Sequence, residues 1–368
     1  MKVRYHVFKD FRLETQAATD EEALLLNKKH ASQIRKLRYS FVSMCYHSPR
    51  KTLYLGTTNR AGDILVAFNP RTGKFRSCGF PRSGLFDPTV SKVHQGITLD
   101  EKRDALYFGI ATLTPTSEFM DGKGGALIRY DCARRKFTRL AHPTPGDYQQ
   151  GTIFDLARRK AYCFTDRGAF AVYDMKKRRT IRYECMQSTP HNGVMDDSGG
   201  IWGTFGAGRH AFFRYNPDRN RFEFPGGASV PNAGKAAGIM YAGAGPVDSI
   251  LNAGDGYIYV GSPLGELSRL DPRSGEVRYL GKPFEGTRLP GLALGPDGWL
   301  YFCGSRESGS LLGRYSREEE RFEFLGRVAH RDGTFLDYAH QMVVIDDAVY
   351  IGETDNKIRS GFLWECRI

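Results

Sequence analysis

The chain has 368 residues and a formal net charge of +12, with 42 glycines, 19 tyrosines and 24 phenylalanines. This composition is typical of short strands joined by tight turns and argues against a helical protein. No apolar run approaches the ~18 residues of a membrane-spanning helix. The positive charge favours an anionic partner, although many basic residues fall in predicted turns, where solvated side chains are the ordinary interpretation.

The N-terminal part of the chain holds one predicted strand, residues 3–8, and one predicted helix, residues 19–37. Acidic residues at 20–22 favour the start of that helix, and basic residues follow them. The first residues lack the apolar core and cleavage site of a signal peptide. They fit a cytoplasmic protein if Met1 is the natural start, and a secreted or periplasmic one if a leader was removed.

The seven cysteines are odd in number and include no CxxC pair. Cys45, Cys163 and Cys303 fall inside predicted strands, where buried free thiols are expected. The cysteine pattern therefore favours a reducing compartment.

A unit of roughly 40–55 residues repeats along the chain, a period typical of propellers and solenoids. Each unit has a short aromatic strand, a loop and a further strand that ends in a turn. The aromatic strands are 53–56, 106–109, 161–164, 201–203, 258–261, 300–303 and 349–352. The strands that follow them are 65–70, 127–132, 170–175, 212–217, 267–272, 311–316 and 362–366.

An inner strand before each aromatic strand and an outer strand at the end bring the unit to four antiparallel strands, which is one propeller blade. The repeat thus predicts an all-β, seven-bladed β-propeller that spans residues 1–368 as one domain. Because the spacing is uneven, a count of six or eight blades stays open. The last unit stops after its third strand, at Ile368. We expect residues 3–8 to supply the missing strand and so remove an exposed sheet edge.

In a propeller, the starts of the inner strands and the loops after the aromatic strands lie at the same end of the channel. The inner-strand starts carry His94, Tyr148, His191, Asn192, Tyr338 and His340. The loops carry Arg60, Arg167, Arg209, His210 and Arg306. Arginine can bind a carboxylate through two parallel hydrogen bonds, and histidine can act as acid or base near neutral pH. Taken singly, each histidine is more often bonded to nearby backbone, and Arg60 and Arg306 are typical surface residues.

The strands at 256–261 and 267–272 resemble those of lyase and lactonase propellers. The predicted face resembles the propeller polysaccharide lyases, which include oligogalacturonate, ulvan and rhamnose–glucuronate lyases. The resemblance implies β-elimination at a uronic acid in an acidic oligo- or polysaccharide. The residues that would take part are Arg209 or Arg167 as the neutralising cation, His94 or His191 as base and Tyr148 as acid. The residues that would bind substrate are Arg60, Asn192, His210, Arg306, Tyr338 and His340.

The resemblance also bears on metals and on rival functions. Oligogalacturonate lyases are expected to hold a metal through several late histidines and a glutamine, whereas here only His340-Gln341 stands near that position. A divalent metal on His94, His191, His340 or Glu353 is compatible with the sequence, which specifies none. A lactonase or sugar hydrolase would need a carboxylate-lined metal, for which the face offers Glu353, Asp355 and Asp248. A non-catalytic propeller that binds an acidic partner is the other alternative; nucleic acid is disfavoured because the aromatic residues fall mostly on strands.

Overall fold

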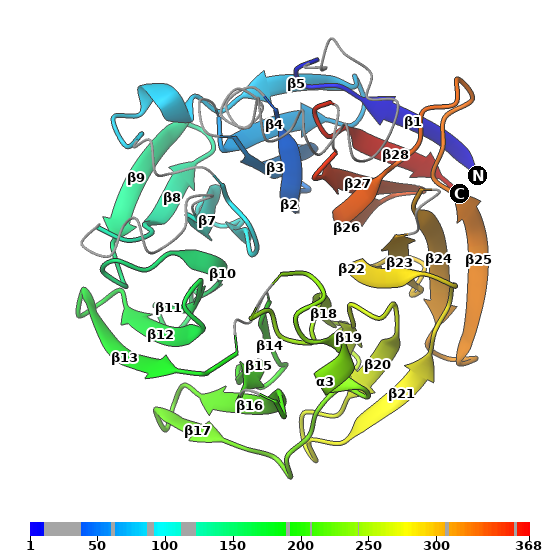
Figure 1. The fold of residues 1–368 in the computed structure, drawn as a ribbon. Coiled ribbons are helices and arrows are strands. Elements are labelled where there is room, and N and C mark those ends of the chain that lie inside the picture. The colour runs from blue at the N-terminus through cyan, green and yellow to red at the C-terminus, as the bar shows by residue number, and fades with distance from the viewer. Residues whose placement is uncertain are drawn as a thin grey trace, which may run out of the picture.

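Seven four-stranded antiparallel sheets are arranged around a central axis (Figure 1). This computed structural model describes residues 1–10, 38–59, 63–86, 92–111, 123–188, 192–206, 208–241, 243–305, 309–356 and 359–368. The helix predicted over 19–37 lies outside the described residues, as do Arg60, His191 and Arg306. The architecture confirms the predicted seven-bladed β-propeller.

Each blade runs in chain order from an inner strand to an outer one. Blades 1 to 4 comprise β2 (Ser40–His47), β3 (Thr52–Thr58), β4 (Leu65–Asn69) and β5 (Lys74–Ser77); β6 (Thr98–Asp100), β7 (Ala105–Gly109), β8 (Leu127–Asp131) and β9 (Lys136–Ala141); β10 (Gln149–Asp155), β11 (Lys160–Thr165), β12 (Ala169–Asp174) and β13 (Arg179–Cys185); and β14 (Val194–Met195), β15 (Ile201–Phe205), β16 (Ala211–Asn216) and β17 (Arg221–Glu223).

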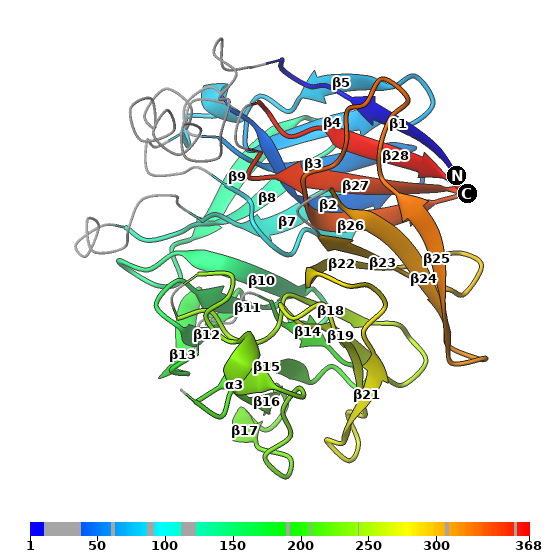
Figure 2. The ribbon, with the colours of Figure 1, turned by 45° about the vertical axis from the view of Figure 1, so that its right-hand side comes forward.

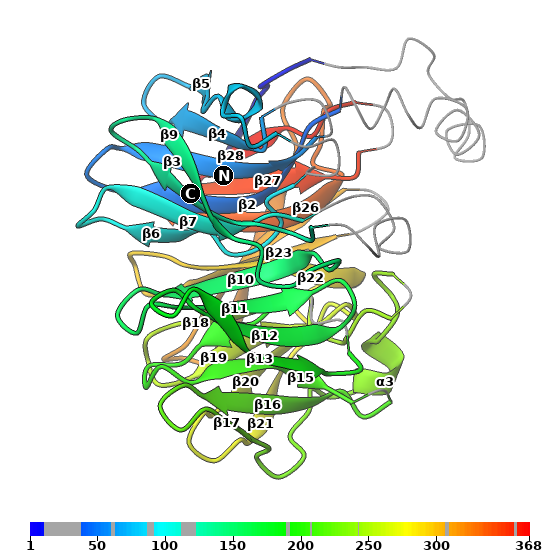
Figure 3. The same cartoon turned by 90° about the vertical axis from the view of Figure 1, so that its left-hand side faces the viewer.

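Blades 5 and 6 follow the same order, and blade 7 takes its outer strand from the N-terminus. These blades comprise β18 (Ser249–Asn252), β19 (Ile258–Gly261), β20 (Leu267–Leu270) and β21 (Val277–Gly281); β22 (Thr287–Leu294), β23 (Leu300–Ser305), β24 (Leu311–Ser316) and β25 (Arg321–Arg327); and β26 (Tyr338–Ile345), β27 (Ala348–Thr354), β28 (Leu363–Arg367) and β1 (Lys2–His6). The helices of the described residues are η1 (Phe80–Arg82) and α3 (Ala233–Ala236). Figure 3, a view from the side, places α3 at one end of the blades. None of the described helices has the length and apolar character needed to cross a membrane.

The N-terminal strand closes the last blade, as predicted. β1 pairs with β28 in an antiparallel register that sets Val3 opposite Cys366 and Tyr5 opposite Trp364. Figure 2 shows β1, β28, β27 and β26 side by side in this sheet. Pairing β1 with β28 satisfies the backbone groups that an open edge would expose.

The second strand of each blade is the most deeply buried, because neighbouring blades pack on both of its faces. All five residues of β7 are buried, whereas the outer strand β5 alternates between exposed and half-buried residues. Between blades 1 and 2, Tyr54 packs in one apolar cluster with Leu106 and Phe108. Full burial of such a side chain contributes about 1.5–3 kcal/mol. Burial on both faces explains why these strands read as continuous apolar runs in the sequence.

Candidate functional site

Two of the predicted histidines meet near the propeller axis. His94 lies in the segment before β6, and His340 lies at the start of β26, so they come from blades 2 and 7. The two Nε2 atoms are 3.0 Å apart, and the ring centroids are 4.8 Å apart. The two residues are 4% and 5% exposed, so only a small part of each is open to solvent.

The segment that carries His94 is held by the neighbouring blades. Lys92 forms isolated bridges with Thr58 and Ala111, and Gln95 pairs with Gly151 of β10 in parallel. Gly96 follows at a φ of +84°, where a Cβ atom would stand 2.0 Å from the Thr152 carbonyl oxygen. Only glycine fits this close approach. The local sequence Gln95-Gly96 thus fixes the place of His94 against blade 3.

Hydrogen bonding assigns the tautomers of the histidine pair in its neutral state. His94 Nδ1 lies 3.0 Å from the Gln150 carbonyl oxygen, which can only accept, so Nδ1 carries the proton. His94 Nε2 then accepts a hydrogen bond from His340 Nε2. This leaves His340 Nδ1 as an acceptor, which faces the Gln95 side-chain nitrogen at 3.5 Å. The pair can take up one further proton if it enters at His340 Nδ1 and the proton on His340 Nε2 passes across the 3.0 Å contact to His94 Nε2.

A titratable carboxyl is linked to this pair through Gln150. Asp166 follows β11, and its backbone N–H donates to the Tyr148 carbonyl at 2.9 Å. The Gln150 side-chain amide donates to Asp166 Oδ1, so Gln150 contacts both His94 and Asp166. Burial raises the pKa of Asp166 to about 7, against the opposing effect of Lys92. Asp166 can therefore give or take a proton near neutral pH.

Lys92 supplies positive charge close to the same carboxyl. Burial lowers the pKa of Lys92, and the nearby charges of Asp166 and Asp355 work in the opposite direction. These two aspartates belong to loops of blades 3 and 7. The site thus combines a cation, a carboxyl and two imidazoles drawn from three blades.

Two acidic residues that the sequence offered for a metal are engaged by arginine. Glu353 is fully buried and accepts from both terminal nitrogens of Arg359, at 2.7 and 2.9 Å. Asp248 accepts from Arg288 at 2.8 and 3.1 Å. Their oxygens stabilise the fold in this arrangement. A carboxylate-lined hydrolase centre is therefore poorly supported.

The other predicted site residues have different surroundings. Asn192 is buried and donates to the Asp248 carbonyl at 2.9 Å. His210 is buried beside Ser188 at 3.3 Å, and burial lowers its pKa. Tyr148 is buried, and its backbone N–H donates to Asp147 Oδ1 at 2.9 Å. The exposed members of the set are Arg167, Arg209 and Tyr338.

The sequence places Gln150 and Asp166 on the same face as His94 but assigns neither of them a role, and it does not single out Lys92. Lys92 stands two residues before His94, which in an extended segment places both side chains on the same face. Asp166 directly precedes Arg167, and a single acidic residue in a loop carries no pattern that marks it as buried. Gln150 lies two residues after Tyr148. In each case the sequence gives the residue type, but it does not show that the side chain is buried next to other polar groups.

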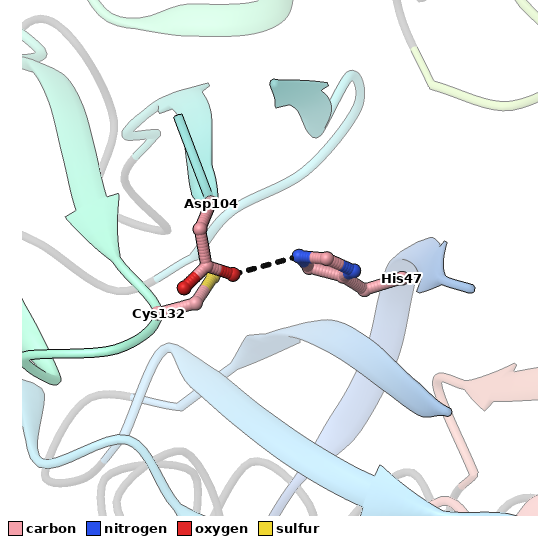
Figure 4. A group of neighbouring side chains, drawn as sticks. All are labelled: His47, Asp104 and Cys132. Carbon is pink, nitrogen blue, oxygen red and sulfur yellow. Dashed lines mark hydrogen bonds and ion pairs between the residues drawn. The ribbon is translucent and has the colours of Figure 1, made fainter. Parts of the chain in front are cut away.

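A second group of polar side chains lies at the opposite end of the blades, where β2 ends. His47, Asp104 and Cys132 place ligand atoms within 4.8 Å of one another (Figure 4). His47 Nε2 lies 2.9 Å from Asp104 Oδ1, and Arg50 donates to both oxygens of the same carboxylate. Burial raises the pKa of the Cys132 thiol, which keeps it protonated. These contacts describe a hydrogen-bonded joint between blades 1 and 2.

No protein-family model and no characterised protein matches the chain in sequence. Among solved structures, virginiamycin B lyase from Staphylococcus aureus is similar in fold, with 10% identity, full coverage of both chains and a TM-score of 0.63. The extracellular domain of BT4673 from B. thetaiotaomicron has 14% identity over 98% of this chain and 43% of that one, with a TM-score of 0.58. U3-55K has 10% identity over 91% of this chain and 97% of that one, also with a TM-score of 0.58. At these identities the likeness shows a shared fold.

Proposed function

We propose that the chain is a carbon–oxygen lyase that cleaves uronate-containing glycans by β-elimination, at the end of the axis where His94 meets His340. The observation that carries the proposal is the contact of these two histidines, together with a carboxyl of pKa about 7 that Gln150 links to them. The likeness in fold to virginiamycin B lyase supports the broad class of enzyme. The sequence resemblance to the propeller polysaccharide lyases supports the substrate class.

The proposed reaction assigns one step to each group. Lys92 pairs with the uronate carboxylate, which makes the C5 proton more acidic. The His94–His340 pair removes that proton, and the C5–H electrons form the C4–C5 double bond. The C4–O4 bond breaks, and protonated Asp166 donates its proton to the departing oxygen. The more exposed Arg167 and Arg209 then serve to bind neighbouring charged sugars.

The pH dependence follows from the role of Asp166. An acid must be protonated to act, and its pKa of about 7 leaves it increasingly ionised above that pH. We therefore expect the turnover rate to fall as the pH rises beyond about 7. Measuring initial rates across pH with Asp166→Asn as a comparison tests the assignment, because that variant should be slow at every pH.

The direct test is the ultraviolet absorbance of the unsaturated uronate, followed while the protein is incubated with pectic, ulvan-type and rhamnose–glucuronate glycans. We expect a rise with one of them, and a loss of at least ~100-fold in His94→Gln and His340→Gln, the scale of general acid–base catalysis. His330→Gln is the matched control, because His330 contacts Tyr5 and Asp332 away from the pair.

An unchanged rate in both pair variants would overturn the assignment of the base. No rise with any of these glycans would overturn the lyase itself. Tight binding of one glycan without any product would instead favour the binding-module alternative.

A further inference from the structure

A groove of about 570 Å³ lies between blades 2 and 3, away from the histidine pair. These blades are neighbours in Figures 1 and 3, where β7 and β9 lie on one side and β10 to β13 on the other. Turns between inner and second strands contribute to it, so it opens toward the end of the blades opposite His94. The arginines that line it are Arg103, Arg129, Arg139, Arg159 and Arg178.

The charges in this groove are not balanced. Arg103 pairs with Asp100 at 3.0 Å, and Arg129 pairs with Asp131 at 3.2 Å. The other three lining arginines form no ion pair with any described residue. Guanidinium groups stay charged at every physiological pH, so the groove carries an excess of three positive charges. A concave surface lined by one sign of charge attracts ligands of the opposite sign.

The backbone conformation of the turns does not require arginine at two of these positions. Arg159 and Arg178 both adopt a φ of 54°, in the left-handed region that favours glycine. The position of Arg159 is taken by glycine in blades 4 to 6, and that of Arg178 is taken by glycine in blades 1 and 5. The glycines at these equivalent positions are Gly199, Gly256 and Gly298, and Gly73 and Gly275. Other residues also adopt this geometry at the equivalent positions, including Lys51 in blade 1 and Arg135 in blade 2, so these turns accept arginine without requiring it.

The remaining lining adds apolar surface and two phenols. Leu140, Leu156 and Met175 contribute hydrocarbon, and Tyr107 and Tyr173 contribute aromatic rings with hydroxyl groups. We propose that this groove binds a small organic ligand that carries at least two oxyanion groups, either phosphates or carboxylates. The planar fork of arginine fits both groups, the apolar lining fits the body that joins them, and the volume lies in the ordinary range of ligand sites.

The test is isothermal titration of the full chain with three probes: inorganic pyrophosphate, adenosine diphosphate and trigalacturonate. We expect at least one to bind, more weakly as salt is added, because exposed charges are screened. Binding of the two phosphate probes identifies phosphate as the group recognised, and binding of trigalacturonate identifies carboxylate. The triple variant Arg139→Gln/Arg159→Gln/Arg178→Gln should bind about tenfold more weakly or worse.

The matched control is Arg219→Gln, because Arg219 is exposed at the outer hairpin of blade 4 and forms no ion pair with a described residue. All three substituted arginines are exposed, so the triple variant should keep the melting temperature of the wild type. If no probe binds the wild type, or if the triple variant binds as tightly as the control, the proposal is overturned. Lyase activity is not the readout, so failure here leaves the histidine site untouched.

Discussion

Gln150 contacts both parts of the candidate site. Its backbone carbonyl accepts from His94, and its side-chain amide donates to Asp166. Its side-chain oxygen is buried and has no hydrogen-bond partner among the described residues. A buried acceptor without a donor costs about 1–3 kcal/mol. A sugar hydroxyl that donates to this oxygen would remove that cost, which is consistent with a bound glycan.

Asp166 makes the stability of the fold depend on pH. Burial raises its pKa from 3.8 to about 7, so the folded chain holds the proton more tightly than the unfolded chain does. The stability from this proton is present in full below pH 3.8 and is lost as the pH rises to about 7. We expect the wild type to lose stability relative to Asp166→Asn over this interval, with no further divergence above it. Urea unfolding of both proteins across the interval measures the difference, and parallel curves throughout would contradict it.

At the scale of elements, the inner edge of blade 2 is unusual. β6 has three residues, and the segment before it bridges to both neighbouring blades as well as to Ala111 of its own blade. The Gln95 carbonyl accepts from the Thr152 N–H at 3.2 Å. This crossing carries Lys92 and His94 toward the axis.

Gly96 holds that crossing against blade 3. Comparing its substitution with that of a glycine in an open turn should show how much stability the close contact with blade 3 contributes. In Gly84→Ala the new methyl group meets open space at a φ of +72°, so the cost is about 1–2 kcal/mol for the left-handed backbone alone. In Gly96→Ala the same cost is joined by the clash with Thr152, a further ~1–3 kcal/mol. Chemical denaturation of the two variants compares them. Equal losses in the free energy of unfolding would mean that the backbone of blade 3 can move away from the new methyl group at no cost.

At the scale of the whole molecule, the fold was predictable because its signal repeats. Strands such as β7 are buried on both faces and read as apolar runs, and hairpin residues such as Asn69 and Gly73 mark the turns. The sequence also placed His94 and His340 at the same end of the channel, because both stand at the start of an inner strand. The surroundings of Lys92 and Asp166 were not predictable, because they depend on burial between blades 2, 3 and 7 that no local pattern encodes.

Closure of the ring is also a property of the whole molecule. Removal of residues 1–8 should leave the edge of β28 unpaired, lower the melting temperature and promote association, which size-exclusion chromatography detects. A synthetic peptide of residues 1–8 should restore both properties when added. The control Lys2→Ala/Arg4→Ala keeps the backbone pairing and changes two exposed side chains. A truncated chain that stays monomeric with an unchanged melting temperature would contradict the role of β1.

The pairing of β1 with β28 also fixes an order of events during synthesis. β1 emerges from the ribosome before every other described strand, yet its partner emerges after all of them. Tyr5 and His6 contact Asp332 and Glu365, which lie 327 and 359 residues further along the chain. The first strand to be made is thus the last to be paired. Until β28 is complete, β1 and the last finished strand each have an unpaired edge that chaperones or neighbouring copies can reach.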